Sequence, residues 1–166
     1  AALGRVLVAG NEPVALLAMR RRLEAASWTV DVTVSAAEAL ERALARDAYD
    51  AVIIDSVMPD MSGFDFCRRL RRSQGGESLP VVLLTEAGRP DEAEAAFKAG
   101  ASDYVSRPAS GLELAARIKT HVELAASVRR ELTQAARMAE FDKYRTLATL
   151  SAGVAHEINT PNNPVI

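Results

Sequence analysis

Short apolar runs alternate with amphipathic stretches along the first part of the chain. The runs are rich in valine and isoleucine and are mostly bounded by polar or turn residues, which predicts buried β-strands at 5–9, 29–34, 51–54, 81–84 and 103–105. The stretches between them carry apolar residues at helical spacing, which predicts helices near 13–25, 36–46, 64–73 and 92–99. Gly75 and Gly76 are expected to end the third of these helices and Gly100 the fourth.

This alternation predicts an α/β fold, a five-stranded doubly wound parallel sheet with helices on both faces. Ligands of such sheets bind beyond the carboxyl ends of the strands. Asp55 and Thr85 close two strands and Arg107 follows a third, so a carboxylate, a hydroxyl and a cation are expected to converge. These groups suit a phosphoryl group as nucleophile, donor and charge neutraliser. The alternative is a strand-end turn aspartate and a solvated arginine.

A different pattern begins after Ser110, where no further strand is predicted. Apolar or small residues recur there at alternating spacings of four and three, which indicates a long coiled-coil helix that pairs with a second copy. The pattern lapses at Asp142 and Thr146, so a junction between helical modules is expected. The seam consists of Leu114, Ile118, His121, Ala125, Val128, Leu132, Ala135 and Ala139, and a new stripe of Leu147, Leu150, Val154 and Ile158.

Composition narrows the class of protein. A chain of 166 residues has room for one domain and an appendage. A hydrophobic fraction of 49% with a net charge of -2 fits a soluble globular protein and argues against a nucleic-acid partner, which usually requires a basic surface. Cys67 is the only cysteine, and no apolar run approaches the ~20 residues that span a bilayer. A reducing, cytoplasmic setting is therefore expected.

Three motifs around the predicted strand ends resemble the response-regulator receiver family. They are D-x-x-M-P-x-x-x-G at 55–63, the LLT run that ends at Thr85, and AGASDYVSRP at 99–108. The resemblance implies a receiver domain over 1–122 with the flavodoxin-like strand order 2-1-3-4-5. It also implies Asp55 as the phosphoacceptor, Thr85 as the switch hydroxyl and Tyr104 as the aromatic residue that reorients with it.

The chain departs from this family at three positions of the site. Gly10 and Asn11 stand where receivers usually carry two acidic residues that help to hold Mg2+, and Arg107 stands where they carry lysine. Mg2+ prefers hard, anionic oxygen ligands, so a weak or absent Mg2+ site at Asp55 is expected. An arginine can pair bidentately with a carboxylate, as lysine cannot. Either Asp55 is phosphorylated poorly, or the domain is a pseudo-receiver locked by an Asp55–Arg107 pair.

A second candidate site lies near the end of the sequence. On a helix, His156 falls opposite the second apolar stripe and shares its exposed side with Thr160, while Glu157 is adjacent and suited to orient the imidazole. A plain surface histidine is the alternative. The run LSAGVAHEINTP resembles the H-box of sensor histidine kinases. That resemblance implies His156 as phosphoacceptor, Glu157 as acid/base, and Thr160 as the residue that positions water for dephosphorylation.

These features together predict the receiver region of a cytoplasmic hybrid histidine kinase, with a signalling helix over 110–145 and the start of a truncated dimerisation domain at 146–166. No nucleotide-binding motif is present, so ATP is expected only in a further domain. The expected partners are a second copy, through the helix, and another receiver or phosphotransfer protein. Two alternatives stay open: a phosphorylation-independent dimerising module, and a relay carrier in which Asp55 and His156 exchange a phosphoryl group.

Overall fold

The computed structural model describes residues 1–159 of the chain, and their side chains as far as residue 154. Strands and helices alternate along the first domain, and one long helix follows. The elements are β1 (Gly4–Ala9), α1 (Pro13–Ala25), β2 (Trp28–Thr33), α2 (Ala36–Leu44), β3 (Ala51–Asp55), α3 (Gly63–Arg72), β4 (Val81–Thr85), α4 (Asp91–Ala99), β5 (Asp103–Ser106) and α5 (Gly111–Asn159).

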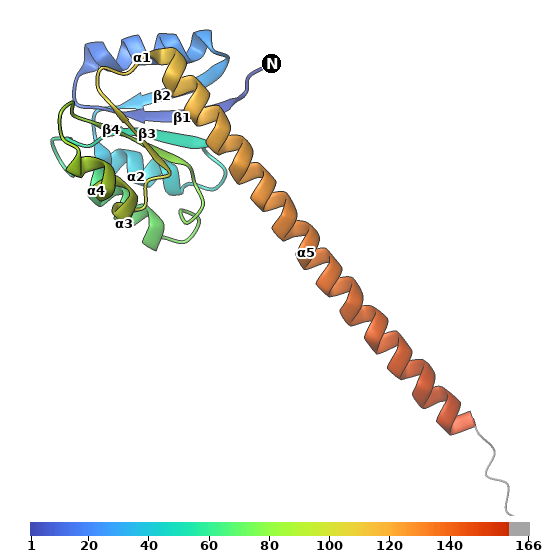
Figure 1. Ribbon diagram of the computed structural model, residues 1–166. Coiled ribbons are helices and arrows are strands. Elements are labelled where there is room, and N and C mark those ends of the chain that lie inside the picture. Colours follow the sequence, from blue (N-terminus) through green and yellow to red (C-terminus); the bar gives the residue numbers. More distant parts are fainter. Residues whose placement is uncertain (160–166) are drawn as a thin grey trace, which may run out of the picture. The chain divides into compact units, whose positions relative to one another are not determined.

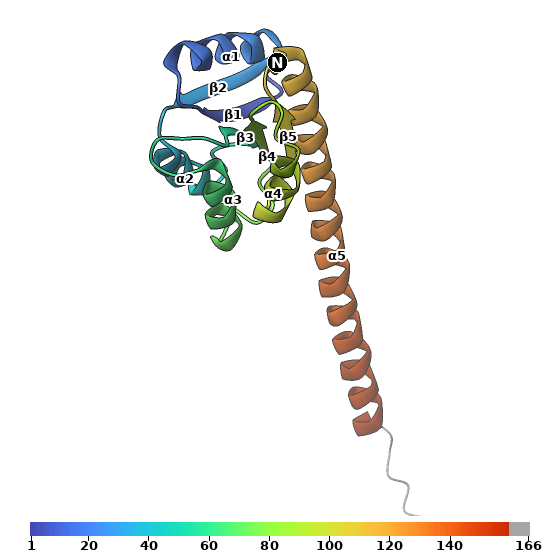
Figure 2. The ribbon, with the colours of Figure 1, turned by 60° about the vertical axis from the view of Figure 1, so that its left-hand side comes forward.

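All five strands are parallel, and their order across the sheet is β2-β1-β3-β4-β5 (Figure 2). The fold class and strand order expected from the sequence are therefore confirmed. The central strands β3 and β4 are buried along their whole length, which explains why their sequences are continuous apolar runs rather than alternating ones.

The two faces of the sheet bury separate apolar clusters, because successive strand residues point to opposite sides. Helix α1 and the first turns of α5 cover one face, and α2, α3 and α4 cover the other (Figure 1). The first face buries Val8, Ile53 and Leu84 against Leu16 of α1 and Leu114 of α5. The second buries Leu7, Ile54 and Leu83 against Phe66 and Leu70 of α3.

Helix boundaries depend on local caps. The Ser35 hydroxyl accepts a hydrogen bond from the backbone N–H of Glu38 and so begins α2, and Ser62 does the same for Asp65 in α3. Gly100 ends α4 in the left-handed conformation, as expected. The expectation that Gly75 and Gly76 end α3 is wrong. The helix ends earlier, at Arg72, because the backbone is already extended at Ser73.

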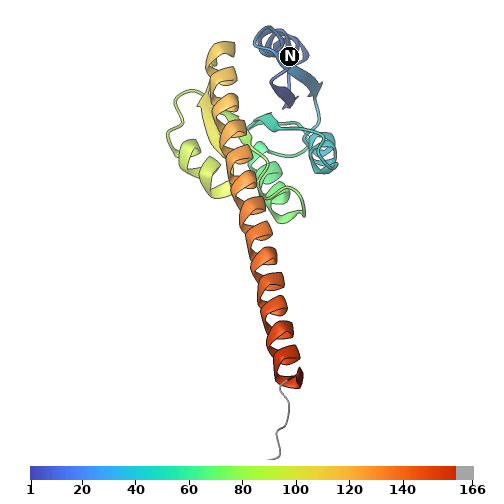
Figure 3. The ribbon, with the colours of Figure 1, turned by 90° about the vertical axis from the view of Figure 1, so that its right-hand side faces the viewer.

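The chain divides into two compact units, Ala1–Ala125 and Ala126–Ile166. In the first unit, α5 begins beside β5, and Leu114 and Ile118 are fully buried in the domain's own core (Figure 3). The interpretation of these two residues as part of a seam with a second copy is therefore wrong. A heptad pattern reports which side of a helix is covered, but not which surface covers it.

In the second unit, the described part of α5 exposes its large apolar side chains. Val128 and Leu132 of the predicted seam are solvent-accessible, as are Leu147, Leu150 and Val154 of the second stripe. A helix with this much exposed apolar surface is typical of a segment that packs against a partner. Among the described residues, no helix combines the length and the apolar character that crossing a membrane requires.

Candidate functional site

Four of the strands end at one edge of the sheet and bring the predicted site residues together. Asp55 is the last residue of β3, Thr85 is the last of β4, and Arg107 follows β5. Gly10 and Asn11 follow β1, which lies beside β3. The backbone N–H of Arg107 donates to the carbonyl of Thr85 over 2.9 Å, which anchors the loop after β5 to the end of β4.

The Asp55 carboxylate has partners at both oxygens. Its Oδ1 forms an ion pair with the Arg107 guanidinium, and its Oδ2 accepts a hydrogen bond of 3.3 Å from the backbone N–H of Asn11. The Asp55 side chain is only 6% exposed, whereas that of Arg107 is 40% exposed. A carboxylate this deeply buried requires a compensating charge, and here Arg107 supplies it from the solvent side.

Two glycines allow the close approach of backbone around Asp55. A Cβ on Gly63 would lie 2.3 Å from the Asp55 carbonyl oxygen, so only glycine lets α3 start this close to the end of β3. A Cβ on Gly10 would lie 3.0 Å from both Asp55 Oδ2 and the Leu16 side chain. Gly10 is thus adapted to a tight contact with the carboxylate, and a longer residue there would displace Leu16.

The donor set around Asp55 does not fit a Mg2+ ion. The ion prefers several hard oxygens, most of them anionic. Among the described residues that line the small space beside it, Asp55 is the only buried carboxylate, and Arg107 and Asn11 already engage it. The Asn11 side-chain amide donates to the Val57 carbonyl over 3.2 Å. Among the side chains described, those of residues 1–154, no group of three or more histidine, cysteine, aspartate or glutamate residues is placed to hold a metal. On the side of Asn11 and Val57, the space beside Asp55 is a small cavity of about 40 Å³.

Comparison with known proteins decides the family. Residues 6–119 match the response regulator receiver domain. The chain belongs to this family. A role in two-component phosphorelay signalling follows from that membership.

A curated relative and two solved structures illustrate the match. The phosphate regulon transcriptional regulatory protein PhoB of Rhizobium meliloti (strain 1021) is 37% identical over 117 residues, which cover 70% of this chain and 51% of that protein. The signal receiver domain of a signal transduction histidine kinase from Syntrophus aciditrophicus is 26% identical, with a TM-score of 0.66, over 72% of this chain and 90% of that one. The chain spans about half the length of the curated relatives it matches.

The second structure shows the same fold at lower identity. It is the receiver domain of a sensor histidine kinase from Pseudomonas aeruginosa PAO1, with a TM-score of 0.67 and 24% identity over 74% of this chain and 99% of that one. In that protein a magnesium ion is coordinated in the active-site cleft. The likeness shows that the present receiver has the same fold.

Thr85 and Tyr104 are the two residues for which the sequence predicted switch functions. Thr85 is buried, with 2% of its surface exposed, at the strand end next to Asp55. Tyr104 is half-buried on β5, and its ring meets that of Phe97 edge-on with 5.7 Å between the ring centroids. The switch functions of both side chains stay predictions, whereas their places in the receiver are those expected.

Asp60 also shapes the site, and the sequence analysis missed it. Its carboxylate accepts hydrogen bonds from the backbone N–H groups of Ala37 and Ala36 and from the Ser35 hydroxyl. The bonds from Ala37 and Ala36, with that from Ser35, lower the pKa of Asp60 to about 2. Asp60 thus ties the loop after Asp55 to the start of α2, a contact between residues more than twenty positions apart, for which the sequence holds no signal.

A second carboxylate, that of Asp103, joins β5 to α5 within the first unit. Asp103 Oδ2 lies 3.1 Å from His121 Nε2 and accepts a hydrogen bond of 3.0 Å from Arg117. Burial alone would raise the pKa of Asp103, but the hydrogen bonds from His121 and Arg117 outweigh it, so this pKa lies below its usual value. His121, expected to be a packed or interface residue, is therefore a half-buried partner of Asp103 in the receiver itself.

The residues predicted to carry the histidine chemistry lie beyond the last described side chain. His156 and Glu157 belong to α5 by its backbone bounds, but their side chains lie beyond the described ones. Thr160 lies outside the described residues altogether. The roles of all three stay predictions that rest on the H-box resemblance.

Proposed function

We propose that this chain is the receiver region of a histidine-kinase signalling protein, in which the receiver acts through a fixed conformation rather than through phosphorylation of Asp55. One observation carries this proposal, the ion pair between Asp55 and Arg107. A phosphoryl donor must approach the carboxylate that Arg107 covers. The pair therefore blocks the nucleophile and at the same time supplies the positive charge that a metal would otherwise provide.

The electrostatics of the site favour this locked state. Without an acidic pair, Asn11 contributes no anionic ligand, and Glu12 beside it is exposed to solvent. A guanidinium keeps its charge at all accessible pH values and matches a carboxylate geometrically, so the pair persists without a metal. Removal of one partner of a buried pair is costly because it leaves the other charge without compensation.

Replacement of Arg107 by alanine is expected to lower the free energy of unfolding by about 2 kcal/mol at neutral pH. The value is below the ~3–5 kcal/mol of a fully buried pair, because the Arg107 side chain is partly exposed. Urea denaturation of the receiver measures it. The matched control is Arg20→Ala, which breaks an exposed pair with Glu24 on α1 and should lower the free energy of unfolding far less. Equal effects of the two substitutions would contradict the proposal that the Asp55–Arg107 pair holds the receiver in a fixed conformation.

The proposal assigns phosphoryl chemistry to His156, with Glu157 as its acid/base and Thr160 as the residue that positions water. Support comes from the H-box resemblance and from helix α5, which leads from the receiver into this segment. The likeness to the receiver of a signal transduction histidine kinase, at 26% identity, is consistent with such a context. ATP would be bound by a separate domain, and the phosphoryl group would pass to an aspartate of another receiver or to a phosphotransfer protein.

A second candidate function is a binding module that dimerises and docks partners without any phosphoryl transfer. The same Asp55–Arg107 pair favours it, since a receiver whose Asp55 is covered can still act through its binding surfaces. The relay carrier, in which Asp55 and His156 exchange a phosphoryl group, is disfavoured because Arg107 covers the acceptor. Labelling at His156, argued below, separates the kinase from the binding module.

Dimerisation is proposed through the exposed seam in the second unit, from Val128 onward. Leu132→Asp is expected to weaken self-association at least about tenfold, because it places a charge in an apolar contact. Phe141→Asp is the matched control, since Phe141 is as exposed as Leu132 and nine residues further places it on the opposite side of the helix. Sedimentation equilibrium measures both. Ile118 is unsuitable as a probe because it is fully buried in the receiver core.

A further inference from the structure

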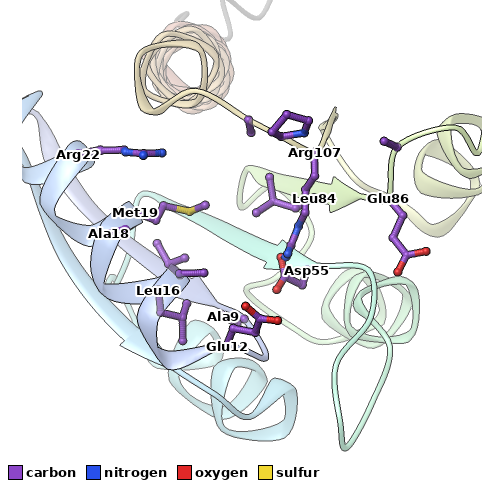
Figure 4. A pocket seen from close by; sticks show the side chains of 16 residues that line it. Ala9, Glu12, Leu16, Ala18, Met19, Arg22, Asp55, Leu84, Glu86 and Arg107 are labelled. Carbon is purple, nitrogen blue, oxygen red and sulfur yellow. The ribbon is translucent and has the colours of Figure 1, made fainter.

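A cavity of about 580 Å³ opens beside the Asp55–Arg107 pair, on the side of the sheet that α1 covers (Figure 4). Its walls come from α1, from the ends of β1, β3 and β4, and from the loop between β5 and α5. The volume lies within the ~300–1,000 Å³ typical of small-molecule sites.

Small side chains on two facing walls leave this space open. Ala15 and Ala18 face it from α1, and Ala87 and Ala109 face it from the loops after β4 and β5. Leu16, Met19 and Leu84 supply the larger apolar surfaces. A leucine or phenylalanine at any of the four alanine positions would occupy part of the space, so the cavity follows directly from the choice of residues.

The charges around the cavity are divided between its two sides. The Asp55–Arg107 pair lies on one side, together with the exposed carboxylates of Glu12 and Glu86. Arg22 reaches over the cavity from α1 on the other side (Figure 4). Asp55 and Arg107 neutralise each other. Arg22 forms no ion pair or side-chain hydrogen bond with the part of the chain that the structure describes, so its guanidinium is available to an anion.

The stem of Arg22 is held in place by the start of α5. A Cβ on Gly111 would lie 2.5 Å from Arg22 Cβ and 2.8 Å from its Cδ, which shows how closely the stem packs against that glycine. A positioned guanidinium binds a carboxylate with two parallel hydrogen bonds. The opposite side of the cavity carries Glu12, which repels an anion, so the site has a defined polarity.

We infer that this cavity binds a small, largely apolar molecule that carries a single carboxylate. The carboxylate pairs with Arg22, and the apolar body lies against Leu16, Met19 and Leu84, close to the Asp55–Arg107 pair. This inference does not depend on the proposed function, because the site exists whether or not Asp55 accepts a phosphoryl group. A ligand there would act on the pair directly, and the receiver would then respond to a small molecule.

The probe for the test is 2-naphthoate, a two-ring carboxylate that fits the volume, with neutral naphthalene-2-carboxamide as its comparison. Titration followed by the amide resonances of the isotope-labelled chain is expected to give a dissociation constant on the order of 0.1–1 mM for the carboxylate. The carboxamide is expected to bind about tenfold more weakly, because it lacks the charge that Arg22 recognises. The perturbed resonances should lie on α1 and in the loop after β5.

Two pairs of variants locate the binding. Arg22→Gln should weaken 2-naphthoate about tenfold and leave the carboxamide unchanged, whereas Arg21→Gln, on the neighbouring residue outside the cavity, should change neither. Ala18→Phe should abolish binding of both probes by filling the space, and Ala37→Phe, at an exposed alanine of α2, should not. The inference is overturned if 2-naphthoate fails to bind, if both probes bind equally, or if Arg22→Gln leaves the affinity of the carboxylate unchanged.

Discussion

A receiver that carries both Asn11→Asp and Arg107→Lys is expected to bind Mg2+ at least about tenfold more tightly than the unmodified chain. The first change adds an anionic ligand beside Asp55, and the second replaces the planar, covering guanidinium with a compact ammonium. One additional carboxylate at contact distance from a divalent cation is worth more than the ~1.4 kcal/mol that corresponds to a tenfold change. Beryllofluoride, a phosphoryl mimic, should then bind at Asp55, and fluorine NMR detects it.

The controls for this experiment follow from the crowding around Asp55. Asn11 is the position to change, because an aspartate at Gly10 would press against Leu16 and Asp55 itself. The same double variant with Asp55→Asn in addition should lose the beryllofluoride signal. Each single substitution should raise the Mg2+ affinity less than the two together, because the added carboxylate and the loss of the guanidinium act on the same site. If the double variant is folded but binds neither Mg2+ nor beryllofluoride, then the missing acidic pair and the covering Arg107 are not what prevents binding at Asp55.

His156→Gln is expected to abolish phosphorylation in a protein that joins this chain to an ATP-binding kinase domain. The reason is that a neutral imidazole nitrogen is the nucleophile, and glutamine has no equivalent atom. The measurement is the incorporation of label from ATP, and the product should be acid-labile and stable in base, as expected of a phosphorylated histidine. Loss of the label should be complete rather than partial.

His121→Gln is the control for that experiment, because His121 is the only other histidine of the chain. It contacts Asp103 within the receiver, so its replacement should leave the label in place and affect only the stability of the first unit. Label that survives His156→Gln would show that the phosphoacceptor lies elsewhere. Complete absence of label in the unmodified protein would favour the binding module instead.

The strand pattern predicted the sheet because burial on both faces leaves a direct record in the sequence. The continuous apolar runs of β3 and β4 required cover on both sides, and Asp55 and Thr85 interrupt that character where the strands end. Their convergence with Arg107 followed from the geometry of parallel strands. The receiver motifs then added the roles that no pattern of hydrophobicity could supply.

Other features depend on contacts between distant segments, which periodicity does not record. The hydrogen bonds that Asp60 accepts from the start of α2, and the alanine-lined cavity, arise only when separate elements meet. The seam on α5 shows the same difficulty, since Leu114 and Ile118 satisfy the heptad pattern but are buried by the receiver. Helix α3 ends close to the expected position, but the extended Ser73 stops it before the glycines that were expected to do so.

Intact-mass spectrometry of the unmodified chain, after incubation with acetyl phosphate and Mg2+, tests the closed Asp55 site most directly. The ion pair with Arg107 predicts a single unmodified species, because the carboxylate is covered and no metal site supports the transfer. The double variant Asn11→Asp with Arg107→Lys, treated in parallel, should gain one phosphoryl group and so show that the reagent is active. Stoichiometric addition of a phosphoryl group to Asp55 of the unmodified chain would contradict the account.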